Sequence, residues 1–442
     1  MFRRARAATL AGKPQPSTEA AQHLGSTTPA GIEVISTLDR LDEKLHEISA
    51  AASISDDAVR AVFASFRMDI PTNQLGDPWS AEYRDAQFDL YSRISSRAGY
   101  MTSNEVSGYV CDPRIPFPYY TQSSTTVGDQ LMALGYLIKT MGLPAQSSIL
   151  EFGPGWGNTT IALARMGYDV TALDIDPNFV QVIQDRADLL GLTLDARVGQ
   201  FSDASSIDRQ YDAVLFYECF HHCSDHIQLL ASLHRLIKPG GRVFLAAEPI
   251  LESFHAPWGV RLDGESLWAI RANGWLELGF TESYFIEACA RSGWEVSRSI
   301  SDVSPLTSIW CLRPQEDCIY PGQRLFPPVD ERGWAPPDSV ESTQRYTTSR
   351  SRLVCPIGMT RTTMCVKLVN PGPRELPYTV RHGSSKLSGR IRAQSQLSLE
   401  LPYHADSGEM VIETDTWCPA MDIPGSTDNR QLGIGVLEVR FC

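Results

Sequence analysis

The stretch ILEFGPGWGNTT, from Ile149 to Thr160, decides the fold of this chain. A short apolar run leads into three glycines spaced two apart, and the polar residues Asn158–Thr160 then precede a helical pattern. Because glycine has no Cβ, a ligand can approach the backbone of such a turn closely. The stretch therefore predicts a ligand site in the crevice beyond the carboxyl end of a strand, beside the acid Glu151.

A regular alternation of strand-like and helix-like patterns surrounds this turn. The strand-like runs are SILEFG, DVTALDID, TLDARVGQ, YDAVLFYECF, RVFLAAEPI and WEVSRSISD, with helix-like runs between most of them. Strands that alternate with helices imply a parallel sheet with right-handed crossovers. We therefore predict the α/β class, with a doubly wound, Rossmann-like domain over residues 146–315.

The remaining segments differ in composition from this central domain. Residues 1–30 are rich in Ala, Pro, Ser, Thr and Gly, which predicts disorder. Residues 56–145 mix helical and aromatic pieces and predict a helical cap that shapes the acceptor pocket. Residues 316–345 are crowded with proline and are typical of a linker. Residues 346–442 show short alternating runs, which predict an all-β, sandwich-like domain.

Residues 31–55 carry a heptad-like seam. Its apolar positions step by 4, 3, 4, 3 and 4, and they are Val34, Leu38, Leu41, Leu45, Ile48 and Ala52. This spacing favours a short coiled coil, and through it a homo-oligomer. The alternative is an amphipathic helix that packs on the body of the same chain.

Charge and composition exclude several classes of protein. The net charge is -13, whereas binding to nucleic-acid phosphates favours a basic surface. No apolar run approaches the ~20 residues of a membrane span. The basic N-terminus has too short an apolar part for a secretory signal. The 10 cysteines include no Cys-x-x-Cys pair, so we expect a reducing, cytoplasmic location without a disulfide framework or zinc ribbon.

Four runs, taken in order, carry a resemblance to a known family. The runs EFGPGWGNTT, VTALDID, YDAVLFYECFHHCSD and LIKPGGRVFLAAEP resemble those of class I S-adenosylmethionine-dependent methyltransferases. The resemblance implies S-adenosyl-L-methionine as the cofactor and Asp174 as the acid that holds its ribose. It also implies further cofactor contacts at Glu151, Gly153, Pro154, Gly155, Asn158, Ile175 and Glu218.

The adenine contact departs from the family pattern. Many members carry Gly-Asp after the third strand, where this chain has Gln200 and Phe201. Asp203 lies slightly later and is our candidate for the adenine contact. Two alternatives to the family reading are a glycine turn without a ligand and a nicotinamide cofactor.

The run YECFHHCSDH, after the fourth strand, supplies candidate catalytic residues. His221 or His222 could act as a general base, because the pKa of histidine lies near working pH. Alternatively, Glu218, His221 and His222 are spaced i, i+3, i+4 and could hold Mg²⁺ or a similar cation on one helix face. Quinone-pathway O-methyltransferases have a similar acid-x-x-acid-His run here, with His in the fourth position in this chain. A third reading is that the two histidines only shape the pocket. Glu248, at the end of the fifth strand, is a further catalytic candidate.

The flanking segments provide the hints about substrate. The C-terminal run DTWCPAMDIPGSTDNRQLGIGVLEVRF and the piece DPWSAEYRDAQFDLYSRI resemble parts of proteins that assemble bacterial surface glycans. We therefore expect O-methylation of a sugar hydroxyl on a bacterial polysaccharide or its precursor, which could cap a growing chain. Exposed Trp and Tyr side chains would suit sugar rings. The expected partner is a glycan or glycolipid acceptor, with peripheral association at the inner face of the membrane.

Two other functional classes remain open from the sequence. One is a small-molecule O-methyltransferase with a quinone or phenol acceptor, which predicts an apolar pocket closed over a flat ring. The other is a binding module that has lost catalysis. Nucleic-acid methylation is disfavoured, because YECF stands where base-methylating enzymes often carry Asn/Asp-Pro-Pro-aromatic.

Overall fold

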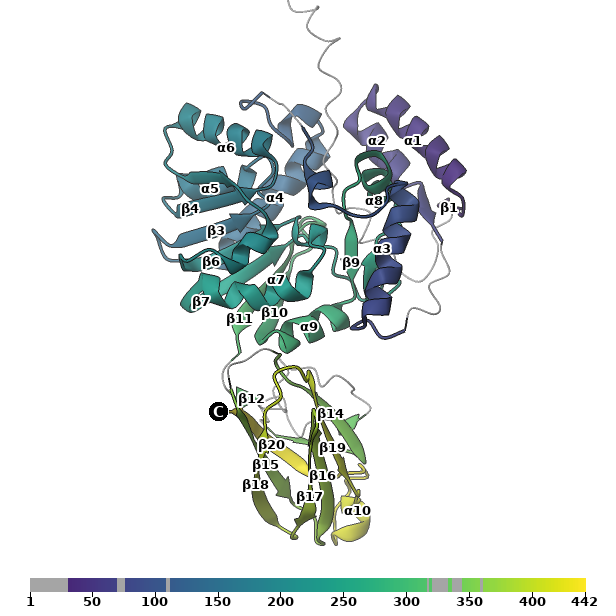
Figure 1. The fold of residues 1–442 in the computed structure, drawn as a ribbon, viewed down its shortest axis with the longest axis vertical. Helices are drawn as coiled ribbons and strands as arrows, with labels where there is room; N and C mark the ends of the chain where they lie inside the picture. Colours follow the sequence, from purple (N-terminus) through teal and green to yellow (C-terminus); the bar gives the residue numbers. More distant parts are fainter. Residues whose placement is uncertain are drawn as a thin grey trace, which may run out of the picture. The chain divides into compact units, whose positions relative to one another are not determined.

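A computed structural model describes two compact units (Figure 1). The described residues are 31–69, 76–108, 112–315, 333–335, 344–357 and 361–442, together with the backbone of the strand at 318–319. The first unit comprises the described residues up to Phe285 with Arg298–Cys311, and the second comprises Ile286–Ser297 with those from Leu312 onward. The predicted disordered segment 1–30 and most of the predicted linker 316–345 lie outside the described residues.

A seven-stranded sheet forms the centre of the Rossmann-like domain, with the strand order β10-β11-β7-β6-β3-β4-β5. The strands are β3 (Ser148–Phe152), β4 (Asp169–Asp174), β5 (Asp195–Val198), β6 (Tyr211–Tyr217), β7 (Ile237–Ala246), β10 (Trp294–Ile300) and β11 (Ser308–Pro314). The pairs β3–β4, β3–β6, β4–β5 and β6–β7 are parallel. This order places the carboxyl ends of β3 and β4 side by side, where the glycine turn leaves the sheet.

The helices of this domain follow the predicted alternation. They are α4 (Ser124–Met141), α5 (Asn158–Arg165), α6 (Pro177–Leu190), α7 (His226–Ser232) and α9 (Glu282–Arg291). Two details differ from the sequence reading. Strand β7 already begins at Ile237 and includes the KPGG turn, and β11 was not predicted. The side chains of β3 are buried along its whole length, which explains why its sequence shows no polar alternation.

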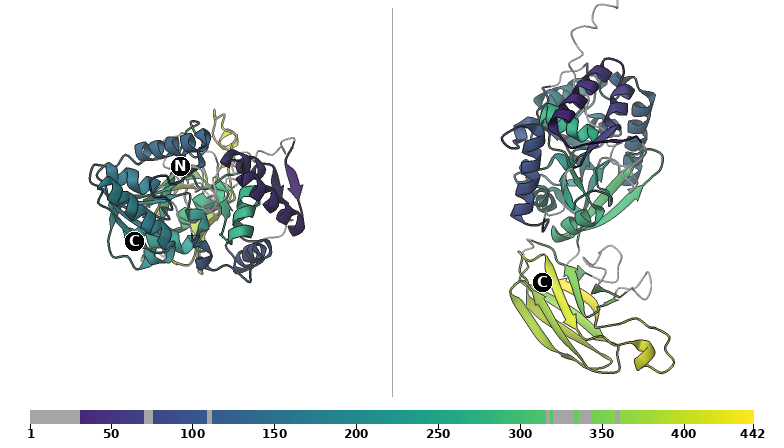
Figure 2. Two further views of the ribbon diagram at one scale, coloured as in Figure 1. Left: turned by 90° about the horizontal axis from the view of Figure 1, so that it is seen from above. Right: turned by 90° about the vertical axis from the view of Figure 1, so that its right-hand side faces the viewer.

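The N-terminal elements lie beside the sheet rather than on its faces, as both views of the purple segments show (Figures 1 and 2). They are β1 (Glu33–Ile35), α1 (Leu38–Ala52), α2 (Asp56–Phe63), β2 (Phe66–Met68) and α3 (Ala81–Ser95). Side chains at the N-caps of these helices accept backbone hydrogen bonds, for example Ser55 from Ala58 and Ser80 from Tyr83.

The heptad interpretation needs a correction. Val34 lies in strand β1, which pairs with β2, so the seam does not run along one helix. Leu41 and Ile48, on α1, are buried in the protein's own core. Leu41 and Ile48 thus pack within the chain, as the amphipathic-helix alternative expects, whereas Val34 and Ala52 are exposed. Self-association of the chain stays a prediction.

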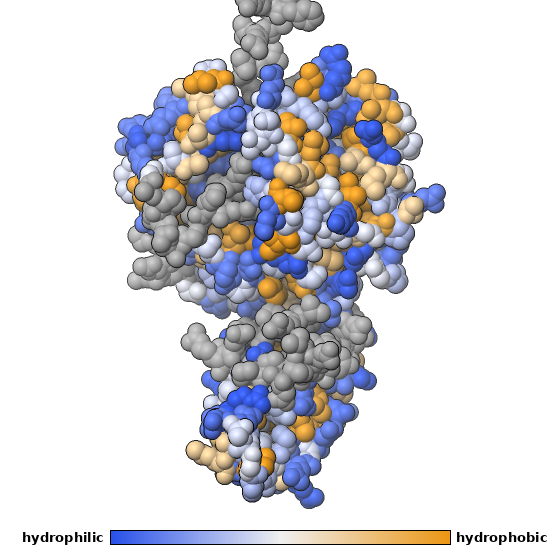
Figure 3. Space-filling model, turned by 180° about the vertical axis from the view of Figure 1, so that it is seen from behind, coloured by the Kyte–Doolittle hydropathy of each residue, from blue (hydrophilic) through white to orange (hydrophobic). Residues whose placement is uncertain are grey.

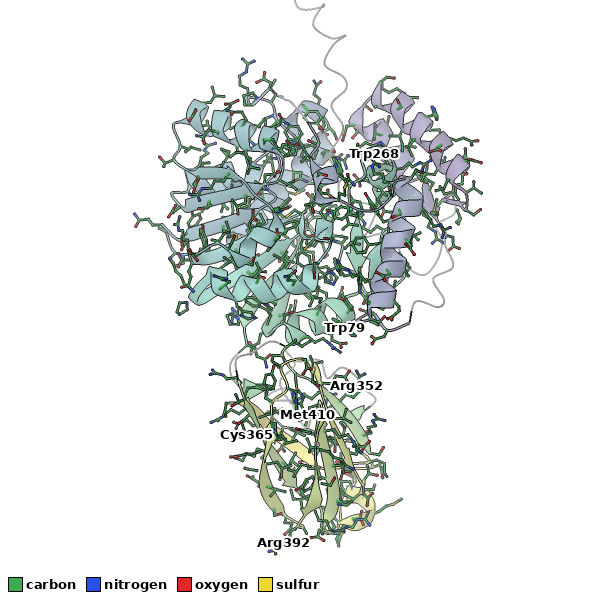
Figure 4. The ribbon with its side chains drawn as sticks, in the orientation of Figure 1. Trp79, Trp268, Arg352, Cys365, Arg392 and Met410 are labelled. Carbon is green, nitrogen blue, oxygen red and sulfur yellow. The ribbon has the colours of Figure 1, made fainter. Side chains whose placement is uncertain are left out.

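A second layer of short elements joins the cap to the sheet. These elements are β8 (Trp258–Val260), α8 (Gly264–Trp268), a π-helical turn (Ala269–Asn273) and β9 (Leu278–Phe280). The hydroxyl of Tyr83 donates to the carbonyl of Trp258 at 2.6 Å, and Trp79 stacks on Tyr284 with ring centroids 4.7 Å apart. Figure 4 labels Trp79, and Trp268 of α8. These contacts fix the cap against the chain that follows β7.

The second unit contains two antiparallel sheets (Figure 1). One sheet has the order β12-β20-β15-β18, with β13 also on β20, and the other has the order β14-β19-β16-β17. The strands are β12 (Cys318–Ile319), β13 (Arg345–Tyr346), β14 (Arg350–Val354), β15 (Thr363–Asn370), β16 (Leu376–His382), β17 (Ser385–Ile391), β18 (Ser395–Pro402), β19 (Glu409–Thr414) and β20 (Gly435–Phe441), and the short helix α10 covers Pro419–Asp422. Val366, Val380 and Met410 lie in one core that both sheets share; Figure 4 labels Met410.

The surface of the second unit does not match one expectation. The aromatic side chains described in this part of the chain lie in its core, and they are Trp334, Tyr346, Tyr378, Tyr403, Trp417 and Phe441. They are therefore not available as exposed platforms for sugar rings.

On the face shown in Figure 3, hydrophobic residues occur in groups among hydrophilic ones. None of the helices described here has both the length and the hydropathy that crossing a bilayer requires.

Candidate active site

The glycine turn adopts a backbone that only glycine tolerates well. Gly153, Gly155 and Gly157 have φ values of 58°, 51° and 71°. A Cβ added at Gly153 would lie 2.7 Å from the Cβ of Cys219. The left-handed conformation and the close packing together explain why three glycines stand at this strand end.

The turn forms one wall of a cavity of about 260 Å³. Gly153, Gly155, Asp174 and Ile175 line it, as the family resemblance implied. The Asp174 carboxylate accepts hydrogen bonds from the backbone N–H groups of Gly155 and Asp176, both at 2.9 Å. Burial raises the pKa of Asp174 to about 6. The carboxylate is thus held at the cavity wall at the end of β4.

Aromatic and apolar side chains line the cavity beside Asp174. Phe152, Leu173 and Phe201 contribute to this wall, together with Gln200. The side chain of Asp203 faces the backbone three residues earlier, because its Oδ2 accepts the N–H of Gln200 at 2.9 Å. Asp203 does not line this cavity, and its contact with a cofactor stays a prediction.

A second cavity of about 260 Å³ adjoins the glycine turn. The predicted residues Glu151, Pro154 and Asn158 line this cavity rather than the first one. Gly153, Trp156 and Glu218 line both cavities, which shows that the two spaces are neighbours.

The polar groups of the second cavity hold one another in place. The hydroxyl of Thr160 donates to the Glu151 carboxylate at 2.5 Å, and burial raises the pKa of that carboxyl to about 7. Asn158 donates to the carbonyl of Phe117 at 2.7 Å. The first bond connects α5 with β3, and the second connects the start of α5 with the segment before α4.

Glu218 stands at the turn after β6 with a left-handed φ of 51°. Its carboxylate accepts a hydrogen bond from the Gln130 amide of α4 at 2.9 Å. The one-turn 3₁₀ helix starts only at Phe220. Glu218 therefore precedes the helical turn and does not share one helix face with His221 and His222.

His222 lines the first cavity, and a short contact with a backbone carbonyl orients its ring. Its Nδ1 lies 2.7 Å from the carbonyl oxygen of Leu276. A carbonyl can only accept, so Nδ1 carries the hydrogen and Nε2 is the basic nitrogen of the neutral ring. Burial, followed by the neighbouring His221, lowers the pKa of His222 well below its usual value. The ring is therefore neutral at neutral pH.

A loop from the cap brings further groups to this end of the cavity. Tyr100, Glu105 and Ser107 line the cavity, and Ser107 donates to Asp176 at the start of α6. One Glu105 oxygen accepts the N–H of Leu276 at 2.8 Å, and the other lies 3.5 Å from Nδ1 of His222. Burial raises the pKa of Glu105 to about 8.

His221 points away from the first cavity into a buried polar cluster. Its Nδ1 lies 2.8 Å from Glu248, whose other oxygen accepts the N–H groups of Cys219 and Phe220 at 2.9 Å each. Glu248 thus fixes the turn after β6 as well as the His221 ring.

Glu277 lies on the far side of the His221 ring. One of its oxygens lies 3.5 Å from Nε2 of His221 and 3.3 Å from Nη1 of Arg261. Arg261 also donates to Asp263 at 3.0 Å. Within the described residues, His221, His222 and Glu277 can each offer one ligand atom, all within 4.8 Å of one another.

Four residues of this region were not predicted from the sequence: Tyr100, Glu105, Arg261 and Glu277. Each lies far along the chain from the glycine turn and has no spacing that links it to His221 or His222. The run ANGWLELGF, which contains Glu277, offers only a weak signal, an acid flanked by apolar residues in a buried segment.

Comparison with known proteins agrees with this geometry. Residues 150–245, which run from β3 to β7, match the family described as a methyltransferase domain. This match covers the glycine turn, Asp174 and the two histidines. It identifies the central part of the chain as a methyltransferase domain.

The relatives found cover the same central region. A ubiquinone biosynthesis O-methyltransferase of Xanthomonas axonopodis pv. citri is 34% identical over 104 residues, which are 23% of this chain and 44% of that protein. A demethylmenaquinone methyltransferase of Tropheryma whipplei is 31% identical over 121 residues, 27% of this chain and 49% of that protein. The chain thus spans less than half the length of these curated relatives.

Among solved structures, a TehB-like SAM-dependent methyltransferase from Corynebacterium glutamicum is 20% identical. The similarity covers 42% of this chain and 88% of that chain, with a TM-score of 0.31.

Proposed function

We propose that the protein is an S-adenosylmethionine-dependent O-methyltransferase that acts on a small hydroxylated acceptor of the quinol or phenol type. One observation carries the proposal. A single cavity is lined by the glycine turn, by the Asp174 carboxylate and by the His222 ring. These groups can serve a ribose, a nucleoside and a reacting hydroxyl in one continuous space.

The residues at the glycine turn fit the cofactor. Asp174 is a buried carboxylate, and a carboxylate can accept hydrogen bonds from both hydroxyls of a ribose. Phe201 and Leu173 offer apolar contacts to an adenine ring, and Gly155 lets the nucleoside reach the backbone. The second cavity, with Glu151 and Asn158, would take the amino-acid end beyond the turn.

The acceptor end of the cavity favours a flat ring. Tyr100, Trp275 and Leu229 line the cavity with large apolar surfaces, and Trp275 directly precedes Leu276, the residue that contacts His222. The named activities of the two curated relatives, in ubiquinone and menaquinone synthesis, point to the same class of acceptor. The sequence-based preference for a glycan acceptor, with chain capping and a membrane-associated complex as its setting, gains no support from the site.

S-adenosylmethionine, when bound, supplies a methyl group on a sulfonium for in-line displacement. The chain's own residues must align the acceptor oxygen and help it lose its proton. His222 lines the cavity, and Nε2 is its basic nitrogen because Nδ1 donates to the carbonyl of Leu276. This nitrogen can take the proton itself, or it can hold a divalent cation that lowers the pKa of the hydroxyl.

A methyl-transfer screen with labelled S-adenosylmethionine tests the proposal. The acceptor panel contains catechols and hydroxylated quinols, and it also contains lipid-linked glycans and nucleotide sugars. Label on the phenolic compounds is the expected result. Label on glycans alone would overturn the acceptor class and favour the glycan reading. If neither methyl transfer nor calorimetric binding of the cofactor is observed, the remaining interpretation is a binding module that has lost catalysis.

A further inference from the structure

Two neighbouring histidine rings are both held by their Nδ1 atoms. Nδ1 of His221 lies 2.8 Å from Glu248, and Nδ1 of His222 lies 2.7 Å from the carbonyl of Leu276. The ring centroids are 4.2 Å apart. In each ring this leaves Nε2 as the nitrogen available to a further partner. Histidine ligands to metals commonly donate their other ring N–H to a carboxylate or a backbone carbonyl in this way.

The atoms around Nε2 of His221 favour a positive charge at this place. Glu248 is surrounded by donors, since its oxygens also accept the N–H groups of Cys219, Phe220 and His221. It therefore acts as an acceptor, and Nδ1 of His221 carries the hydrogen. The lone pair of Nε2 then faces an oxygen of Glu277 at 3.5 Å. Two electron-rich atoms oppose each other there, so a cation or a proton between them would stabilise the arrangement.

The separation of these atoms fits two ligands of one ion better than a hydrogen bond. An N–H···O bond has a typical length of about 2.7–3.2 Å. Two ligand atoms at about 2.1 Å from a tetrahedral ion lie about 3.4 Å apart. The observed 3.5 Å matches the second geometry. The ligand atoms of His221, His222 and Glu277 lie within 4.8 Å of one another, so a modest contraction would bring all three to an ion.

The charges around the three residues also favour a cation. Three acids lie near them: Glu248 and Glu277 are buried, and Glu105 is partly buried. Arg261 is a buried cation that contacts both Glu277 and Asp263. The second oxygen of Glu277 is buried and has no hydrogen-bond partner. A buried carboxylate oxygen without a partner is costly, and an ion held by both oxygens of Glu277 would satisfy it.

We propose that His221, His222 and Glu277 bind a divalent first-row transition cation, such as Zn²⁺ or Co²⁺, through two imidazole nitrogens and one carboxylate. Two nitrogen ligands favour such ions over Mg²⁺, which prefers oxygen ligands. The ligand set differs from the one expected from sequence, because Glu277 takes the place of Glu218. His222 lines the cavity, so an open coordination position there would meet an acceptor hydroxyl. This catalytic use, though not the binding itself, rests on the proposed function.

Cobalt binding to the full-length protein tests the site without an activity assay. The protein is first treated with a chelator and exchanged into metal-free buffer, and Co²⁺ is then titrated while the visible absorption is recorded. We expect a d–d band that saturates at one equivalent and that Zn²⁺ abolishes. Glu277→Gln should weaken the affinity for Co²⁺ at least 100-fold, because it removes a charged ligand.

Glu265→Gln is the matched control, since Glu265 is also a buried acid near Arg261 but is not one of the three ligands. It should bind Co²⁺ as the wild type does. Calorimetric binding of S-adenosylmethionine to each metal-free protein reports whether the fold is intact, because the cofactor contacts lie at Asp174 and the glycine turn.

The two proposals fail in distinguishable ways. Cofactor binding and methyl transfer in chelated protein, without a cobalt band, would overturn the metal site and indicate that a proton lies between His221 and Glu277. A saturating cobalt band that Glu277→Gln removes supports the site, even if none of the acceptors is methylated and the proposed function fails. Equal cobalt affinity in wild type and Glu277→Gln would overturn the ligand assignment.

Discussion

Nδ1 of His222 lies 2.7 Å from the carbonyl oxygen of Leu276, and this contact determines which nitrogen of the ring is basic. The same backbone segment donates the N–H of Leu276 to Glu105 at 2.8 Å. Leu276, three residues after the π-helical turn ends, thus links a histidine after β6 to an acid from the cap. The end of the cavity at His222 is therefore assembled from three distant parts of the chain.

The first prediction concerns His222→Gln. Turnover should fall about 100- to 10,000-fold, because the basic nitrogen at the cavity wall is lost under either the proton-transfer or the cation reading. The affinity for S-adenosylmethionine should change little, since Asp174 and the glycine turn are untouched. Initial rates and calorimetry check the two parts. His46→Gln, on the exposed face of α1, is the control. Full turnover in His222→Gln would remove this ring from the reaction.

The second prediction concerns Asp174→Ala. Loss of hydrogen bonds to a charged acceptor costs about 1–3 kcal/mol, which raises Kd for the cofactor about 5- to 150-fold. Asp169→Ala, at the exposed start of the same strand, should bind the cofactor normally. Calorimetric titration of both variants measures the difference. Equal affinities would mean that the ribose is not held at the end of β4.

Cofactor affinity should also depend on pH through Asp174. Burial raises the pKa of this carboxyl to about 6, so it becomes protonated as the pH falls below that value. A protonated carboxyl is a poorer acceptor for a diol. Kd should therefore rise between pH 7 and pH 5 in the wild type. The Asp174→Ala variant should lack this dependence.

The central domain was predictable because its signals are local. The glycines at 153, 155 and 157 and Asp174 each sit at the end of a buried strand, and parallel strands bring such ends to one edge of the sheet. The residues Gly153, Gly155, Asp174 and Ile175 therefore meet at one cavity. Strand β11 was not predicted, because a short buried strand has no alternation of apolar and polar residues. Its sequence therefore cannot be told apart from other apolar segments.

The end of the cavity at His222 was not predictable, because its residues come together only in the folded chain. Glu105 and Glu277 reach His221 and His222 only through tertiary packing, across more than a hundred and more than fifty residues of chain. The i, i+3, i+4 spacing of Glu218, His221 and His222 suggested Glu218 as the acidic ligand instead. The chain after β6 starts its helical turn two residues later, at Phe220, so that spacing did not translate into a shared face.

The third prediction compares two glycines that share a left-handed backbone. Gly153 has φ 58° and Gly167 has φ 83°, so alanine at either position costs about 1–2 kcal/mol from backbone strain. Only at Gly153 would the new Cβ also press on Cys219, whereas nothing lies within 4 Å at Gly167. Gly153→Ala should therefore lower Tm more than Gly167→Ala and should weaken cofactor binding. Calorimetric melting and cofactor titration of the pair provide the measurement.

The fourth prediction separates core packing from self-association at α1. Leu41 is fully buried within the chain, whereas Leu45 is only partly buried. Leu41→Ala should lower the free energy of unfolding by about 2–5 kcal/mol, and Leu45→Ala by less. Urea denaturation measures both values. A change in mass by sedimentation, without a loss of stability, would instead restore the coiled-coil interpretation.

The fifth prediction uses the pH dependence of stability at Glu151. Burial raises the pKa of this carboxyl from 4.5 to about 7 in the folded protein, so between these values the folded state binds a proton that the unfolded state does not. Its contribution to the free energy of unfolding therefore falls as the pH rises from about 4.5 to about 7, at no more than about 1.4 kcal/mol per pH unit. Glu151→Gln keeps an acceptor for Thr160 and removes the titration. Relative to the wild type, this variant should gain stability as the pH rises.

Asp212→Asn provides the control of opposite sign for this measurement. Burial acts to raise the pKa of Asp212, but hydrogen bonds from Lys238 and Ser148 hold it below 3.8. Its stabilising effect is present above the unfolded pKa and is lost as the pH falls through the lowered folded value. Asp212→Asn should therefore cost the most stability near neutral pH and the least in acid. Urea denaturation from pH 3 to pH 8 measures both variants. Parallel pH profiles for the two variants would contradict the assignment of Glu151 as a carboxyl destabilised by burial.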